Sequence, residues 1–359
     1  MGYIGGASPD DTGKPDLKFW VLQIFNLMNV ILGSGILAMP YVMATVGYGT
    51  FMVSLAAVSC LGLFAIDNLT ILCEKYGISS YEALAEKALG LPGKMYTIAC
   101  IYFHTLIAMV SYMIIVKGEL PEVLIALSKG GSCPENPPIW TNGNFVFIMV
   151  LIVFVIPLSV LRRLDFLGFT SGIAMILMGI FSVVVACYSF IVDCETIGDV
   201  NIDGLNNATC TTFEAITAEN AGHEYQVFQE AVNQNNTNIC DLKIVNDLSK
   251  FKAITAFPII LFAMMCQESV LTIYDELQFQ SRDVLMKIAK ISFLMIFVIY
   301  STVAFFGYKT WGGYTISEVL IMYTINFADS PWIILARVCS LTCVILSTPL
   351  QLDKYSLDK

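Results

Sequence analysis

Charged side chains are scarce in this chain of 359 residues. Lysine, arginine, aspartate and glutamate together make up 13% of it, whereas about 25% is usual for a soluble domain. Hydrophobic residues account for 57%, and the mean hydropathy is +0.72. An ordinary soluble domain is therefore excluded, and the composition predicts an all-α, multi-pass membrane protein.

Histidine is rarer still, with His104 and His223 as the only two, and no cysteines have Cys-x-x-Cys spacing. A zinc or haem centre is therefore not expected. No base, nucleophile and orienting group recur at a spacing that suits catalysis, so the sequence predicts neither an enzyme nor a bound cofactor.

The chain also lacks a basic surplus, because its net charge is −10 and most of the acidic excess lies between Asp193 and Asp247. We therefore expect no nucleic-acid partner. Residues 1–18 are polar, contain several glycines and prolines, and lack a cleavable signal pattern, so they predict a disordered cytosolic tail.

Apolar segments bounded by polar or turn-forming residues predict eight membrane spans. They cover residues 19–42, 48–73, 95–117, 144–161, 167–192, 253–275, 288–307 and 331–350. Lysine and arginine in the short loops gather on the side of the N-terminus, which places both termini in the cytosol. The C-terminal tail is then residues 351–359.

The long polar segment 193–252 falls on the extracellular or lumenal side in this topology. Asn207 and Asn235 each begin an N-glycosylation triplet, which agrees with that placement. An oxidising environment also permits a disulfide, and we expect Cys194 to pair with Cys240 because this bridge joins the two ends of the loop. Free thiols are the alternative, and Cys133 is a further partner for Cys210.

Polar and small residues interrupt the first span near its middle, in the stretch FNLMNVILGSGILAMP (25–40). Gly33-Ser34-Gly35 lowers the cost of leaving helical torsions, and a helix broken at bilayer depth exposes backbone groups that protein, water or ligand must meet. The alternative is a small-residue packing face, but such faces space small residues four apart. The stretch therefore predicts the binding site of a transporter.

The sixth span is interrupted in the same way, in FPIILFAMMCQESVLTIYDELQ (257–278). Gln267, Glu268 and Ser269 fall near its centre, where an ionisable side chain is costly unless it faces a cavity or a partner. The alternative places Glu268 nearer the interface, where water hydrates its carboxylate. Breaks five spans apart indicate two inverted repeats with a site between them, namely residues 19–192 and a partial second repeat, 253–350.

Broken helices suit a zwitterionic ligand. Free N–H groups at Gly33, Ser34 and Gly35 carry partial positive charge and favour a carboxylate. Free carbonyl groups at the ends of the first half-helices favour an ammonium group or a sodium ion. The expected ligand is therefore a small amino acid, with sodium or a proton as the coupling ion.

Four stretches resemble the amino acid/auxin permease family, and most closely the sodium-coupled neutral amino acid transporters. They are FNLMNVILGSGILAMPY (25–41), SYEALAEKALG (80–90), CQESVLTIYDELQFQSR (266–282) and KISFLMIFVIYSTVAFFGYKTW (290–311). The resemblance implies the inverted-repeat fold of bacterial leucine transporters with eleven helices, of which about eight are present here. It also implies a disulfide in the large glycosylated loop.

The resemblance gives Asn29, the second Asn of the FNxxN motif, a role in the sodium and substrate sites. With the two breaks, the expected substrate-binding residues are Asn29, Gly33, Ser34, Gly35, Cys266, Gln267 and Ser269. The expected ion-coupling residues are Asn29, Glu268, Ser347 and Thr348.

The chain departs from the family pattern at both proposed ion positions. Family members commonly read Cys-His-Pro where this chain has Cys266-Gln267-Glu268. Their eighth span carries a hydroxyl eight residues after the arginine that Arg337 matches, and here that position is Ile345. Glu268 therefore favours proton coupling as an alternative to sodium, because a shielded carboxylate without a fixed cation binds a proton more readily.

The sequence thus predicts a secondary active symporter of neutral amino acids in the plasma membrane or a lysosomal or vacuolar membrane. Spans nine to eleven are missing after Pro349, so the alternative is a non-transporting regulatory form or an amino-acid sensor. A channel is disfavoured because no polar stripe continues along several spans.

Overall fold

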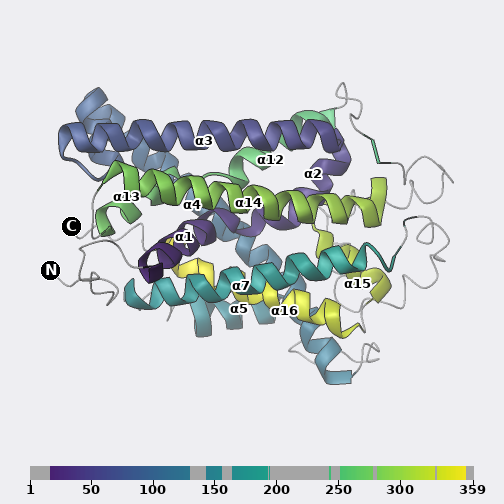
Figure 1. Ribbon diagram of the computed structural model, residues 1–359. Helices are drawn as coiled ribbons and strands as arrows, with labels where there is room; N and C mark the ends of the chain where they lie inside the picture. The colour runs from purple at the N-terminus through teal and green to yellow at the C-terminus, as the bar shows by residue number, and fades with distance from the viewer. Residues whose placement is uncertain are drawn as a thin grey trace.

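The structure is a computed structural model that describes residues 17–129, 143–155, 164–192, 194, 242–243, 251–277, 281–327 and 330–352. Within these ranges the chain forms helices joined by short turns, and none of the described residues lies in a strand (Figure 1). The expected all-α class is confirmed.

Six helical stretches among the described residues are long and apolar enough to cross a membrane, namely 48–76, 81–124, 170–188, 256–275, 282–311 and 331–348. A bent pair, 17–32 with 34–46, makes a seventh if it counts as one span. The chain is therefore a multi-pass membrane protein. Of the predicted span 144–161, the structure describes the short helix α5 (Gly143–Val150) and the π-helical turn η3 (Leu151–Val155).

The first predicted interruption is present. Helix α1 (Leu17–Leu32) ends before Gly33, whose torsions of φ 17° and ψ −151° are not helical. A 3₁₀ segment, η1 (Ser34–Ala38), leads into α2 (Met39–Val46), and the axis bends by 52° across the break. Pro40 lies in the first turn of α2, where a missing N–H breaks no intrahelical bond.

The second interruption is also present, slightly earlier in the chain than the polar residues indicated. Helix α12 (Phe251–Ala263) ends before the non-helical residues 264–266, and α13 (Gln267–Glu276) follows. Gln267, Glu268 and Ser269 thus form the first turn of α13. An acidic side chain in a first turn is favourable, because the helix N-terminus carries partial positive charge.

Helix α4 (Tyr81–Lys129) consists of two helical parts. Gly90 separates them with a positive φ of 71°, a conformation that glycine adopts without steric cost. The Oγ of Ser80 accepts a 3.3 Å hydrogen bond from the N–H of Ala83 and caps the first part. Lys94 and Glu86 form an exposed ion pair of 2.7 Å near the bend.

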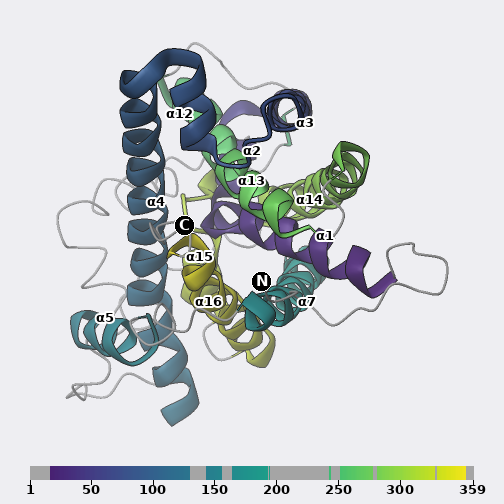
Figure 2. The same ribbon diagram turned by 90° about the vertical axis from the view of Figure 1, so that its left-hand side faces the viewer.

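The long helices sort into two groups by their packing (Figures 1 and 2). One, the α14 group, consists of α2, α3 (Tyr48–Tyr76), α12, α13 and α14 (Arg282–Trp311). The other, the α16 group, consists of α4, α5, α7 (Leu164–Tyr188) and α16 (Pro331–Leu352). The short helices η4 (Gly312–Tyr314) and α15 (Val319–Phe327) connect α14 to α16. Helix α1 packs against both groups through α7 and α14, and α7 also packs directly against α14.

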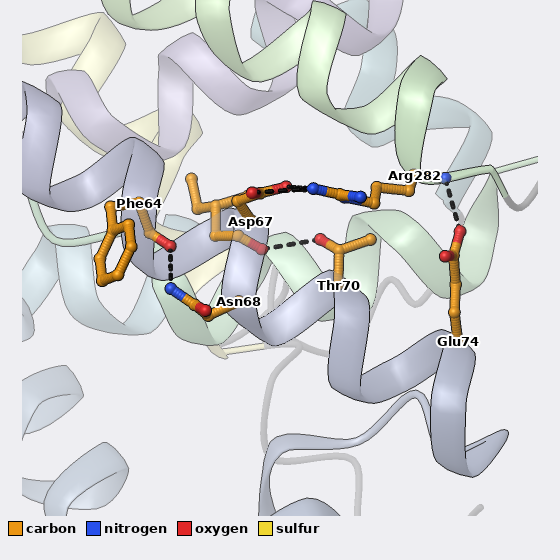
Figure 3. Close-up of polar contacts among 7 residues, drawn as sticks. Phe64, Asp67, Asn68, Thr70, Glu74 and Arg282 are labelled. Carbon is orange, nitrogen blue, oxygen red and sulfur yellow. Dashed lines mark hydrogen bonds and ion pairs between the residues drawn. The ribbon is translucent and has the colours of Figure 1, made fainter.

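A charged cluster fixes the start of α14 to α3 (Figure 3). The guanidinium of Arg282 donates two hydrogen bonds to the carboxylate of Asp67, at 2.8 and 2.9 Å. The backbone N–H of Arg282 donates a third bond, of 3.0 Å, to Glu74. The connection that leaves α13 is therefore anchored to α3 at its far end.

Most of the predicted loop 193–252 lies outside the described residues, including Asn207, Asn235 and Cys240. Cys194 is described and takes part in a disulfide. Its pairing with Cys240 stays a prediction, as do the two glycosylation sites.

Candidate functional site

The two helix breaks meet at a small cavity of about 30 Å³. The first break contributes Gly33, Ser34 and Gly35, and the second contributes residues just before Gln267. Among the described residues, the cavity is lined by Val30, Ile31, Gly33, Ser34, Gly35, His104, Ala108, Tyr112, Phe262, Ala263 and Met265. The interrupted segments of spans one and six therefore share one site, against which α4 supplies a third wall.

Close approach requires a glycine at position 35 of the first break. A Cβ on Gly35 would lie 2.5 Å from the Cβ of Ala263 and 3.2 Å from its Cα, and contacts this short are not tolerated in a packed interior. A Cβ on Gly33 would lie 2.9 Å from the hydroxyl oxygen of Tyr112, the far end of a side chain that can shift. Gly35 thus allows the two breaks to touch.

Tyr300 of α14 joins the carbonyl groups at both breaks. Its hydroxyl lies 3.0 Å from the oxygen of Ile31, 3.4 Å from that of Leu32 and 3.2 Å from that of Ala263. A phenol has one proton, so it satisfies these three acceptors only in part. The carbonyl oxygens therefore leave a region of negative potential between the ends of α1 and α12.

Asn29 is the centre of a second polar cluster. Its Nδ2 donates to the Oγ of Ser171 at 3.3 Å, and its Oδ1 accepts a 2.9 Å hydrogen bond from Ser347. Ser171 in turn donates to Oδ1 of Asn26 at 3.2 Å. The cluster joins α1, α7 and α16, and the Ser347 hydroxyl also lies 2.8 Å from the carbonyl oxygen of Cys343.

The other predicted residues have more local contacts. The hydroxyl of Thr348 donates to the carbonyl of Val344 in its own helix, at 2.9 Å. The side chain of Gln267 accepts a 3.1 Å hydrogen bond from the N–H of the preceding residue, Cys266. Ser269 is buried, and its hydroxyl has no hydrogen-bond partner among the described residues.

Glu268 does not join the Asn29 cluster in these contacts but lies beside the cavity. Its Oε1 is 2.8 Å from Nδ1 of His104, and the two side chains are 10% and 11% exposed. The imidazole also packs against the ring of Phe262, with 5.1 Å between centroids. The predicted ion-coupling residues thus divide between two places, Asn29 with Ser347 and Glu268 with His104.

A third polar pair lies between α4 and α16. Nε of Arg337 is 3.4 Å from Oε2 of Glu119, and both side chains are almost completely buried. A guanidinium nitrogen of Arg337 also donates to the carbonyl of Leu320, at 3.4 Å. The pair fixes the α16 group internally, away from the residues that line the cavity.

Sequence reasoning missed His104, Glu119, Ser171 and Tyr300. Glu119 could have been predicted from the sequence, because an acidic residue at the end of an apolar helix needs a buried partner. The predicted third span ended at residue 117, two positions too early to include it. Ser171 and Tyr300 carry no such signal, since a single hydroxyl inside an apolar helix is common.

Comparison with known proteins gives one consistent result. Residues 19–354 match the family described as transmembrane amino acid transporter protein. The chain is similar to sodium-coupled neutral amino acid symporter 2 of Danio rerio, with 31% identity over 98% of this chain and 65% of that protein. It is equally similar to sodium-coupled neutral amino acid transporter 4 of Homo sapiens, at 31% identity over 98% of this chain and 69% of that protein. The chain thus spans about two thirds of the length of these relatives.

Proposed function

Because the chain belongs to the transmembrane amino acid transporter family, a family of transporters and not of enzymes, we propose that it carries neutral amino acids across a membrane by secondary active transport. The observation that supports this most directly is the meeting of two helix breaks at one cavity. Unpaired backbone groups at bilayer depth are costly, and a zwitterion supplies partners for both kinds.

The amino acid binds between the breaks in this proposal. Its carboxylate accepts hydrogen bonds from the N–H groups of Gly33, Ser34 and Gly35. Its ammonium group lies toward the carbonyl oxygens of Ile31 and Ala263, where Tyr300 shares a single proton among three acceptors. A cavity of about 30 Å³ holds only a water molecule or two, so Tyr112 moves aside for the substrate.

Sodium is the coupling ion that the names of the relatives favour. Asn29 and Ser347 present oxygen atoms from α1 and α16 that are 2.9 Å apart, and oxygen ligands suit a hard cation. A proton carried by Glu268 is the alternative, and the buried position of this carboxylate beside the cavity supports it.

The two helix groups provide the moving parts. We infer that the α14 group rocks against the α16 group, with α1 between them, and so exposes the cavity to each side in turn. Residues 19–192 then form the first inverted repeat and residues 253–350 part of the second. The breaks in α1 and α12 occupy corresponding positions in these repeats.

Uptake into proteoliposomes tests the proposal. The purified chain is reconstituted, and accumulation of a radiolabelled neutral amino acid is measured with an inward sodium gradient and with choline in its place. We expect accumulation that depends on sodium, or on an imposed proton gradient if Glu268 carries the coupling ion. Absence of both uptake and equilibrium binding of the amino acid would overturn the proposal.

A further inference from the structure

The polar contacts of this molecule differ in which helix groups they connect. Arg282 and Asp67 form an ion pair inside the α14 group, and Glu119 and Arg337 form one inside the α16 group. The pair His104 and Glu268 instead joins α4 of the α16 group to α13 of the α14 group. It therefore crosses the boundary at which the proposed rocking motion takes place.

The position of this pair relates it directly to the cavity. His104 lines the cavity, and Glu268 is in the first turn of α13, immediately after the second break. Helices α4 and α13 make little other contact with each other. A hydrogen bond of 2.8 Å between side chains that are about one-tenth exposed is thus a principal link across this seam.

Helix α13 is separated from α12 at the end that carries Glu268, and it packs against α3 and α1. Residues 264–266 have left the helical conformation and separate α13 from α12. The connection beyond Leu277 leads to Arg282, which three hydrogen bonds fix to α3 (Figure 3). One end of α13 is thus anchored, and the other is held to α4 by Glu268.

We propose that the hydrogen bond between His104 and Glu268 is a latch that closes the cavity at the seam of α4 and α13. This inference rests on the proposed transport function, because it assigns the latch a place in the transport cycle. The bond breaks when the first turn of α13 moves away from α4, and it forms again when the cavity closes. His104 acts in this role as a positioning residue.

The chemistry of the pair suits a contact that opens and closes. When the seam is closed, the hydrogen bond between the two side chains lies in a region of low dielectric constant, where it is stronger than in water. When the seam opens, water enters and hydrates both side chains, which offsets much of the lost hydrogen bond. The hydrogen bond is therefore strong while water is excluded from the seam and weak once water has entered. Breaking of the bond and entry of water thus favour each other.

Cys266 provides a reporter of the latch that does not depend on substrate. It is the residue before α13 and is only 1% exposed, whereas Cys187 is an exposed thiol in the last turn of α7. The full chain is incorporated into nanodiscs and treated with N-ethylmaleimide. The rate of alkylation of Cys266 is then measured by peptide mass spectrometry, with the rate at Cys187 as the internal standard.

We expect Glu268→Gln and His104→Phe each to raise the alkylation rate of Cys266 about tenfold relative to Cys187, which corresponds to a latch weakened by about 1.4 kcal/mol. His104→Lys supplies a hydrogen-bond donor opposite Glu268 and should return the rate toward the wild-type value. The matched control is Glu86→Gln, which removes the exposed ion pair with Lys94 inside α4 and should leave the rate unchanged.

Two outcomes would overturn the latch. One is a wild-type rate at Cys266 in both Glu268→Gln and His104→Phe; the other is an equal rise in Glu86→Gln. Size-exclusion profiles verify folding, and Glu268→Asp, which shortens the side chain by one methylene, replaces any variant that does not fold and should give a smaller rise. Altered labelling in a chain that neither binds nor takes up amino acids would refute the transport function but preserve the latch.

Discussion

The hydroxyl of Ser347 in α16 donates a 2.9 Å hydrogen bond to Oδ1 of Asn29 in α1, although 318 positions separate the two residues. Both side chains are buried, and the bond joins the interrupted helix to the α16 group. Asn29 is also bonded to Ser171 of α7, so its amide is fixed in orientation from two sides. Three predictions follow from this contact and from others at the breaks, and a fourth concerns the buried pair of Glu119 and Arg337.

Removal of the Ser347 hydroxyl should weaken cation binding. In Ser347→Ala the Oδ1 atom of Asn29 loses a buried donor, and the proposed cation loses one oxygen ligand. A loss of about 1.4 kcal/mol corresponds to a tenfold higher half-saturating sodium concentration. Initial uptake rates over a series of sodium concentrations measure this value, and Asn29→Ala should raise it at least as much.

The control for this experiment lies on the same helix. The hydroxyl of Thr342 donates only to the carbonyl of Val338 in α16, at 2.7 Å, so Thr342→Ala should leave the sodium dependence unchanged. An unchanged sodium dependence in both Ser347→Ala and Asn29→Ala would remove the two residues from the cation site.

A single methyl group at Gly35 should abolish uptake. In Gly35→Ala the new Cβ would lie 2.5 Å from the Cβ of Ala263, so the two breaks must separate. Overpacking of this kind typically costs about 1 to 3 kcal/mol. The second change Ala263→Gly removes the closest contact and should restore part of the uptake.

Gly179 in α7 offers a matched substitution in open space, because a Cβ there would meet nothing within 4 Å. Gly179→Ala should therefore leave uptake unchanged and stabilise the helix by up to about 1 kcal/mol. Equal effects of the two glycine substitutions would show that the contact between the breaks is unimportant.

Loss of the Tyr300 hydroxyl should destabilise the junction of the breaks. Tyr300→Phe leaves the carbonyls of Ile31, Leu32 and Ala263 without their shared donor, which costs about 1 to 3 kcal/mol for a buried acceptor. The apparent melting temperature in detergent should fall. Tyr96→Phe is the comparison, since Tyr96 is 73% exposed, and its melting temperature should match that of the wild type.

The buried pair of Glu119 and Arg337 should behave non-additively. Glu119→Gln or Arg337→Met leaves one charge buried without its partner, and such changes cost about 3 to 5 kcal/mol. The double variant removes both charges and should be more stable than either single variant. Melting temperatures of the four proteins form a double-mutant cycle; additive losses would contradict coupling between the side chains.

The sequence predicted the breaks well because their causes are local. Gly33-Ser34-Gly35 weakens a helix wherever it occurs, and an acid such as Glu268 inside an apolar segment indicates a cavity or a partner nearby. Both breaks are present, although the second precedes Gln267 instead of including it. The all-α class was also predictable, because composition and the length of the apolar segments are properties of the sequence itself.

The partners across the site were not predictable, because they depend on packing between distant segments. Nothing near Asn29 in the chain indicates that Ser171 and Ser347 reach it, and His104 was noted only as one of two histidines. Ser347 is one of the hydroxyls nearest to Ile345, the position at which the resemblance leads us to expect one, but its spacing in the chain does not place it beside Asn29. The contact becomes visible only in the packing of α1 against α16.

In helix α1, the side chain of Asn29 contacts Ser347 of α16, and the carbonyl of Ile31 accepts a hydrogen bond from Tyr300 of α14. These two groups lie within a single turn of the same helix. A ligand that displaces α1 at its contact with α16 therefore also alters the contact of α1 with α14. If a bound cation raises the affinity for the amino acid by some factor, thermodynamic linkage requires the bound amino acid to raise the affinity for the cation by the same factor.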